Sequence, residues 1–108
     1  MLNCAIIMGR LVADPELKTT TSGIPVTSFR VAVDRDFVKQ GEERQTDFFD
    51  VVAWKQTAEF ITRHFRKGSM IAVQGHLQSR SYEDRNGSKH KVVEIVADDV
   101  SFAGSKDN

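Results

Sequence analysis

The sequence contains a single cysteine, two prolines and no long apolar run. One cysteine cannot form an internal disulfide, and Cys4 lies in an apolar stretch, so we interpret it as a small core or interface residue rather than a reactive thiol. No segment is long and apolar enough for a membrane span, and the apolar run at residues 5–8 has no positive charge before it and is too short for a signal peptide. We therefore expect a cytoplasmic protein.

A net charge is also missing, because 15 basic and 15 acidic side chains balance. This balance counts against an indiscriminate nucleic-acid binder that relies on a strong overall field. Acidic residues gather between positions 36 and 50, whereas several basic residues lie from position 63 onward. Any binding of a polyanion must therefore come from local clusters. With 108 residues, the chain can bury one core and is expected to form a single domain.

Side-chain groups that would indicate catalysis or metal binding are missing as well. His64, His76 and His90 fall on a predicted helix, a strand and a strand end, without the spacing typical of metal ligands. Asp47 and Asp50 would point to opposite faces of one strand, which excludes their working as a general acid–base pair. We expect a protein that is not an enzyme, with no catalytic residue, no cofactor and no metal site.

The most informative stretch that is present is residues 46–55, which are rich in Phe, Val and Trp and contain no Gly or Pro, so they predict a strand. Alternation gives this strand a core face with Phe49, Val51 and Ala53, and a second face with Phe48, Asp50, Val52 and Trp54. Two large rings beside an aspartate are unusual for a buried face. Exposed rings on a sheet can stack nucleobases, at about 1–3 kcal/mol per base. Burial of both faces is the alternative, and this strand alone does not decide between them.

The order of the predicted elements indicates a fold class. Strands are predicted over 3–12, from Pro25 through the alternating Phe29, Val31 and Val33, over 46–55, over 70–82 and over 89–102, with Asn86-Gly87 as a hairpin turn. The spacing of Ala58, Ile61 and Phe65 predicts one helix, which begins at Gln56 or Thr57 and ends at Lys67-Gly68. Five strands with one helix between the third and fourth are typical of an all-β OB-fold, a five-stranded Greek-key barrel. We expect this domain over residues 1–103, followed by a short disordered tail at 104–108.

Several short motifs add a family resemblance over residues 3–103. They are MGRL at 8–11, DPEL at 14–17, FRVAV at 29–33, TDF at 46–48, VVAW at 51–54, RKGS at 66–69 and GHLQSRSY at 75–82. Each motif is weak alone, but in this order and at this spacing the chain resembles the bacterial single-stranded DNA-binding (SSB) protein family. The resemblance implies a nucleoid-associated protein that binds single-stranded DNA without marked sequence preference and protects it during DNA replication, recombination and repair.

The resemblance also implies the residues that contact the DNA. Bases would stack on Phe37, Phe48, Trp54 and Tyr82. Strand alternation independently puts the last three on the side away from the core, whereas Phe37 shares the parity of the core residues, so the strand must have ended or bulged before it. The basic side chains that could meet phosphates are Arg10, Arg30, Lys55, Lys67, Arg80 and Lys91. Asp50 would repel phosphate, and we predict that it forms an ion pair with Arg30.

Assembly and partners follow from both lines of reasoning. The first strand is apolar on both faces, with Cys4, Ile6 and Met8 on one of them, and an open apolar edge invites pairing with another copy. The resemblance implies a homotetramer.

Full-length family members continue into a flexible tail with an acidic tip that recruits replication and repair proteins. This chain stops at residue 108, so either it has been trimmed to the DNA-binding core or this member lacks the tail, and we do not expect such recruitment. A protein-interaction subunit of a replication complex, built on the same fold, is the alternative function.

Overall fold

The computed structural model describes residues 1–104, so most of the predicted disordered tail, residues 105–108, lies outside the described part. Within residues 1–104 the chain forms six strands and one helix. In chain order they are β1 (Ala5–Leu11), β2 (Lys18–Thr19), β3 (Pro25–Asp34), β4 (Thr46–Trp54), α1 (Lys55–His64), β5 (Met70–Glu83) and β6 (Lys89–Phe102). The five long strands correspond to the five predicted ones, and β2 is an additional two-residue strand on the edge beside β3.

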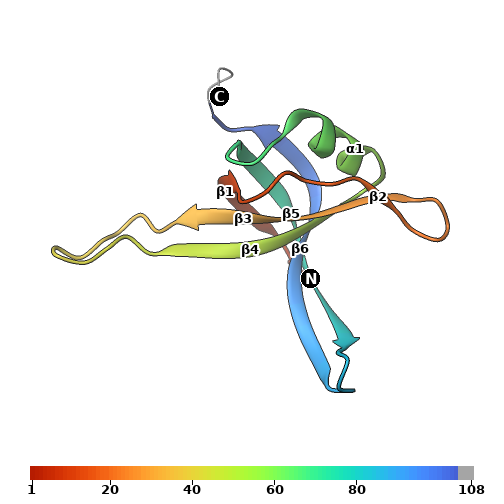
Figure 1. Ribbon diagram of the computed structural model, residues 1–108. Coiled ribbons are helices and arrows are strands. Elements are labelled where there is room, and N and C mark those ends of the chain that lie inside the picture. Colours follow the sequence, from red (N-terminus) through yellow and green to blue (C-terminus); the bar gives the residue numbers. More distant parts are fainter. Residues whose placement is uncertain (105–108) are drawn as a thin grey trace.

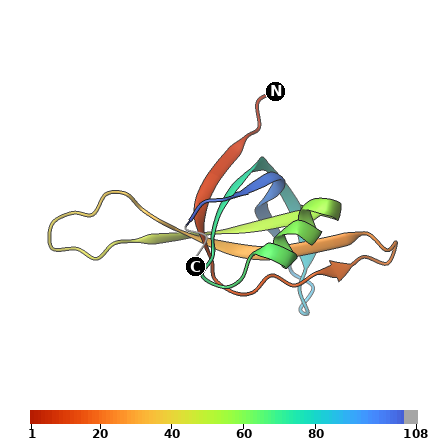
Figure 2. The ribbon, with the colours of Figure 1, turned by 90° about the horizontal axis from the view of Figure 1, so that it is seen from above.

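The five long strands form a closed ring of pairings. Neighbours follow the order β1, β5, β6, β4 and β3, and the ring closes because β1 also pairs with β3. The first strand reaches both neighbours by changing partner along its length, from β5 at Ala5–Arg10 to β3 at Arg10–Leu11. Figure 2, in which the molecule is seen from above, shows β1 as a curved strand along one side of this ring. The ring, with α1 between β4 and β5, confirms the predicted OB-fold.

Two glycines permit the close approach of strands within the ring. A Cβ atom at Gly9 would collide with the carbonyl oxygen of Ala32, and one at Gly75 would collide with the carbonyl oxygen of Val96. Gly9 therefore lies where β1 passes from one partner to the other. At Gly75 the pairing of β5 with β6 shifts register, which marks a β-bulge.

The core fills the ring and is closed at one end by α1. The buried residues that make up this core are Leu11, Phe29, Val31, Val51, Ala53, Ala58, Ile61, Phe65, Ile71, Val73, Ile95 and Ala97. The helix ends at His64, three residues before the predicted Lys67, because Phe65 turns to an extended conformation in order to bury its ring. No helix within residues 1–104 has both the length and the apolar character needed to cross a membrane.

Two long arms extend from the ring (Figure 1). One carries the loop at residues 35–45 between β3 and β4, and the other is the β5–β6 hairpin, which ends at residues 84–88. The prediction that Phe49 is a core residue is wrong, because its side chain is 38% exposed. Alternation assigns Phe49 to the inner face, opposite the fully buried Val31, but its ring is left partly uncovered. Leu77, which alternation places on the same face of β5 as the core residues, is also exposed.

Candidate nucleic-acid interface

The outer face of β3 and β4 carries aromatic and charged side chains in adjacent rows. Residues that pair across antiparallel strands share a face. Arg10, Ala32 and Phe48 form one such row across β1, β3 and β4. Arg30 and Asp50 form the next row, and Trp54 lies opposite Val26 at the end of β4. Phe48 and Trp54 are both exposed, so the alternative that this face of β4 is buried is wrong for its two rings.

The junction between β4 and α1 fixes the direction of the next basic side chain. Trp54 is extended and precedes the helix, and Lys55 follows it in the left-handed conformation with φ 56°. This conformation costs a residue with a Cβ atom roughly 1–2 kcal/mol. Strain of this kind persists only where the surrounding structure imposes it, and it often accompanies functional sites. Here it falls on Lys55, the residue that follows the exposed Trp54 in sequence.

Phe37 lies outside the sheet altogether. The strand β3 ends at Asp34, so the parity of its core residues no longer applies, and the first of the two alternatives left open by the sequence is correct. The ring is 93% exposed in the loop at residues 35–45. Arg35 anchors the base of this loop by donating two hydrogen bonds to Asp47, at 3.0 and 3.1 Å. These bonds hold the pKa of the Asp47 carboxyl below its usual value.

A groove separates the outer face of β3 and β4 from the β5–β6 hairpin. It is lined by Ser28, Phe29, Arg30, Asp50, Val51, Arg80, Val92 and Glu94. The predicted ion pair is present, with Arg30 Nε 3.1 Å from Asp50 Oδ1. A second pair joins Arg80 Nε to Glu94 Oε1 at 3.0 Å. The guanidinium groups of Arg30 and Arg80, which could both bind a phosphate, therefore lie in one groove, but each is already paired with a carboxylate.

The other predicted phosphate contacts are not all gathered at this groove. Arg10 is held at 3.5 Å by Asp34. Lys67 lies at the far end of α1, where its backbone N–H donates to Asp14. Lys91 pairs with Ser81 and so lies on the opposite face of the hairpin from Arg80. Within residues 1–104 no ion pair involves these two lysines or Lys55.

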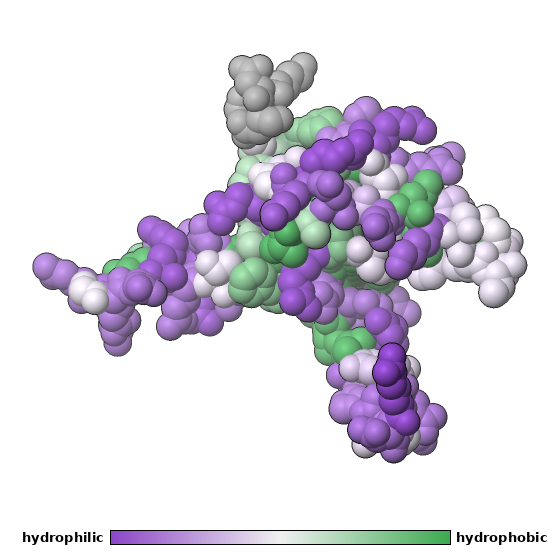
Figure 3. All heavy atoms as spheres, in the orientation of Figure 1, coloured by the Kyte–Doolittle hydropathy of each residue, from purple (hydrophilic) through white to green (hydrophobic). Residues whose placement is uncertain are grey.

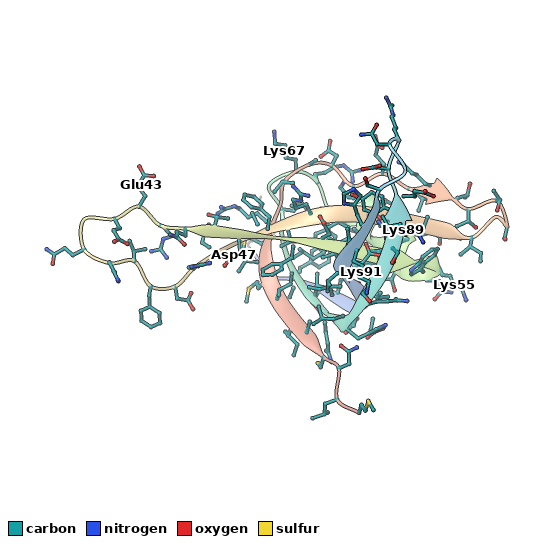
Figure 4. All side chains as sticks on the ribbon, turned by 90° about the horizontal axis from the view of Figure 1, so that it is seen from below. Glu43, Asp47, Lys55, Lys67, Lys89 and Lys91 are labelled. Carbon is teal, nitrogen blue, oxygen red and sulfur yellow. The ribbon has the colours of Figure 1, made fainter. Side chains whose placement is uncertain are left out.

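Charged side chains lie along both arms (Figure 4). Glu43 lies near the tip of the loop at 35–45 and Asp47 lies where that loop joins β4, whereas Lys89 and Lys91 lie along the β5–β6 hairpin. The β5–β6 arm is largely hydrophilic toward its tip, whereas the arm at residues 35–45 mixes hydrophilic and apolar side chains. Apolar side chains also show at the surface where the arms leave the ring (Figure 3). Counted over each arm the charges nearly cancel, with three basic and three acidic side chains at residues 35–45 and four basic and three acidic ones at residues 80–94.

The tip of the hairpin holds a cluster that sequence reasoning missed. Tyr82 lies opposite His90, and their rings stack with centroids 5.2 Å apart and planes 26° from parallel. His90 Nε2 lies 2.8 Å from Asp84 Oδ2. The signal that could have revealed the cluster is the pairing imposed by the Asn86-Gly87 turn, which sets Tyr82 and His90 across from each other. Among residues 1–104, no three His, Cys, Asp or Glu side chains come together as a possible metal site.

The chain matches one protein family, and it is also similar to individual proteins of known name. Residues 2–103 match the model of the "Single-strand binding protein family". The chain is 44% identical over 106 residues to a "Single-stranded DNA-binding protein" of Caldanaerobacter subterraneus subsp. tengcongensis, which covers 98% of this chain and 71% of the relative. A protein of the same name from Staphylococcus aureus (strain MRSA252) is 44% identical over 108 residues, covering all of this chain and 69% of the relative. "Single-stranded DNA-binding protein 2" of Listeria monocytogenes is 42% identical over 108 residues, covering all of this chain and 68% of the relative.

Proposed function

Because the chain belongs to the single-strand binding protein family, we propose that the outer face of β3 and β4, together with the β5–β6 hairpin, is the surface on which it binds single-stranded DNA. As a family member the chain is a DNA-binding protein and not an enzyme, with the family's general roles in DNA replication, recombination and repair. The observation that carries the assignment of the surface is the presence of two exposed rings, Phe48 and Trp54, on one strand face. For a protein with these roles in DNA metabolism we propose a cytoplasmic, nucleoid-associated location.

Bases stack on Phe37, Phe48, Trp54 and Tyr82. All four rings are exposed, and three of them lie on sheet faces that hold their backbones in place. Every base has a face that can stack, so this mode of binding discriminates little between sequences. Phe37 differs because it lies in the loop at 35–45, and its ring must be ordered when the DNA binds.

Phosphates are met by Arg10, Arg30, Lys55, Lys67, Arg80 and Lys91. The three lysines have no acidic partner within residues 1–104, so they can take up a phosphate directly. Each of the three arginines is paired with a carboxylate and must share its charge between that carboxylate and the phosphate. Lysines therefore contribute more to the salt dependence of binding than arginines do.

The chain assembles as a homotetramer, in which β1 joins two copies and two dimers pack together. Ile6 is 70% exposed and Met8 is 55% exposed, on the face of β1 turned away from the core. An exposed apolar strand face of this kind is typical of an interface. A closed assembly would carry several stacking surfaces, so one DNA strand could contact more than one of them and gain avidity.

Light scattering tests the assembly. Ile6→Lys should give a smaller particle and should weaken binding to long DNA far more than binding to short oligomers, because avidity is lost while each surface stays intact. Leu17→Lys is the matched control, since it charges another exposed apolar residue away from β1. A wild-type chain that scatters as a monomer at micromolar concentration would refute the tetramer and leave the DNA-binding surface unaffected.

Intrinsic fluorescence tests the binding function itself, because Trp54 is the one tryptophan of the chain. Oligo-dT should quench this fluorescence to saturation, and duplex DNA should compete poorly because its bases are already stacked. Single-stranded RNA serves as a third ligand. A protein that acted only as an interaction subunit would show no quenching, and equal competition by duplex DNA would refute stacking as the mechanism.

A further inference from the structure

The rings of Tyr82 and His90 form a stacked pair with open surface on both members. A centroid separation of 5.2 Å at 26° is within the range of the favourable offset geometry for aromatic pairs. Tyr82 is 45% exposed and the His90 side chain 46% exposed, so neither ring is enclosed by the other. Because each ring covers one face of the other, a base can stack on the remaining face of either ring, at either end of the pair.

Asp84 fixes the imidazole in position. Its Oδ1 accepts hydrogen bonds from the backbone N–H groups of Asn86 and Ser88, both at 2.9 Å, and its Oδ2 holds His90 Nε2 at 2.8 Å. The bond to His90, followed by those from the backbone, keeps the pKa of the Asp84 carboxyl below its usual value. The carboxylate therefore ties the turn and the ring together as one unit.

The second ring nitrogen of His90 is open to a ligand. Within residues 1–104, no hydrogen bond reaches Nδ1. When Nε2–H is directed at Asp84, Nδ1 of the neutral ring is an acceptor, whereas in the protonated ring it becomes a charged donor. Only the protonated ring attracts a phosphate oxygen. The charge of the ring therefore decides whether this contact forms.

The pair is continuous with the groove of the proposed interface. Tyr82 and His90 share their hairpin face with Arg80, Val92 and Glu94, which line that groove together with Arg30 and Asp50. Arg80 Cζ lies 6.0 Å from the centroid of the Tyr82 ring. The titratable and charged groups facing His90 are thus Asp84 in the turn and, on β5, Tyr82 and beyond it Arg80. Lys89 and Lys91 flank His90 in sequence and point to the other face of β6.

We infer that His90 is a further DNA-contacting residue of this surface: its ring extends the Tyr82 stacking platform, its Nδ1 meets a phosphate when the ring is protonated, and Asp84 is the positioning residue for it. This inference rests on the proposed function. It adds a contact that makes the affinity for single-stranded DNA depend on pH, through a side chain on the hairpin rather than on β3 or β4.

The test compares His90→Ala with His90→Phe by titration with oligo-dT at pH 6 and pH 8. At pH 6, His90→Ala should bind at least about fivefold more weakly, the lower limit for losing one stacked base. His90→Phe keeps a ring and should retain most of the wild-type affinity at pH 8, but its affinity should not rise between pH 8 and pH 6. In the wild type, the log–log salt dependence should be steeper at pH 6 by about 0.7, as expected for one added phosphate contact.

Asp84→Asn and His64→Gln complete the design. Asp84→Asn should reduce the rise in affinity at pH 6 without removing a ring, because the imidazole loses its anchor. His64 lies on α1, away from the groove, and His64→Gln should keep the wild-type pH profile. Wild-type affinity for His90→Ala, or a wild-type pH profile for His90→Phe, would overturn the inference while leaving the proposed function intact. A wild-type protein that binds no oligo-dT at either pH would overturn both.

Discussion

Replacing Asp50 with asparagine would remove the carboxylate that lies between Phe48 and Trp54 on the outer face of β4. Arg30 Nε is 3.1 Å from this carboxylate, and both side chains are more than half exposed. Exposed ion pairs of this kind stabilise a fold by only about 0.2–1 kcal/mol. The variant should therefore remain folded, and the effect of the substitution should fall on DNA binding instead.

The expected magnitude follows from the charges. A phosphate that approaches Arg30 also approaches Asp50, and two unit charges about 4 Å apart in water interact by about 1 kcal/mol. Removing the repulsion should tighten binding at low salt about fivefold. Freeing one guanidinium adds about one phosphate contact, which steepens the log–log salt dependence on a single strand by about 0.7. A fourfold rise in salt should then cost the variant about 2.6-fold more affinity than the wild type loses.

Titration of Trp54 fluorescence with oligo-dT at several salt concentrations measures both effects. Glu59→Gln is the matched control, since it removes the same charge from the exposed side of α1. Combining Asp50→Asn with Arg30→Gln should return the salt dependence to the wild-type value, because the freed guanidinium is then absent. An unchanged salt dependence in Asp50→Asn, or a gain of the same size in Glu59→Gln, would refute the idea that Asp50 competes with phosphate for Arg30.

Three further predictions concern single sites. Trp54→Ala should weaken binding of labelled oligo-dT, measured by anisotropy, by about 1–3 kcal/mol, and Phe48→Ala by somewhat less, with melting temperatures near that of the wild type; a large loss of stability without a loss of affinity would instead assign the rings to the core. Lys55→Gly should be about 1 kcal/mol more stable in denaturant unfolding than Lys55→Ala, since only glycine relieves the left-handed conformation, while both should flatten the salt dependence by about 0.7. Because the folded pKa of Asp84 lies below its ordinary value, the contribution of its carboxylate is complete above about pH 4 and is lost as the pH falls further, so the amide chemical shifts of Asn86 and Ser88 should titrate in that acidic range in the wild type and not in Asp84→Asn.

Much of the fold could be predicted because its signals are local. Asn86-Gly87 indicated the β5–β6 hairpin, and the alternation of Phe29, Val31 and Val33 predicted the inner face of β3, where the first two are buried. Strand alternation predicts which face of the sheet a side chain joins but not how fully its neighbours cover it. For that reason Phe49 was assigned to the core although it is exposed.

The candidate surface could be predicted only in part. The Arg30–Asp50 pair followed from two adjacent strands with a plausible register, and the structure confirms it. The conformation of Lys55 and the stacking of Tyr82 on His90 depend on backbone angles and on pairing across a turn. A list of residue types does not contain that information. Which side chains contact DNA is a question of binding, and the assignments remain predictions until the titrations are made.

The closing of the ring by β1 has a consequence for the order in which the chain can fold. β3 with β4 and β5 with β6 are neighbours in sequence and can form as hairpins as soon as each pair of strands is available. β1, by contrast, pairs Ala5 with Gly75, a partner 70 positions further along. During synthesis from the N-terminus, most of β1 must therefore wait without its partner until β5 has been made, because only Arg10 and Leu11 pair with the earlier strand β3. Pairings between distant residues are slow to form and leave apolar edges open in the meantime. For this chain, β1 with its exposed Ile6 and Met8 is the segment at risk of aggregation in that interval. The rate at which the ring closes sets how long that risk lasts.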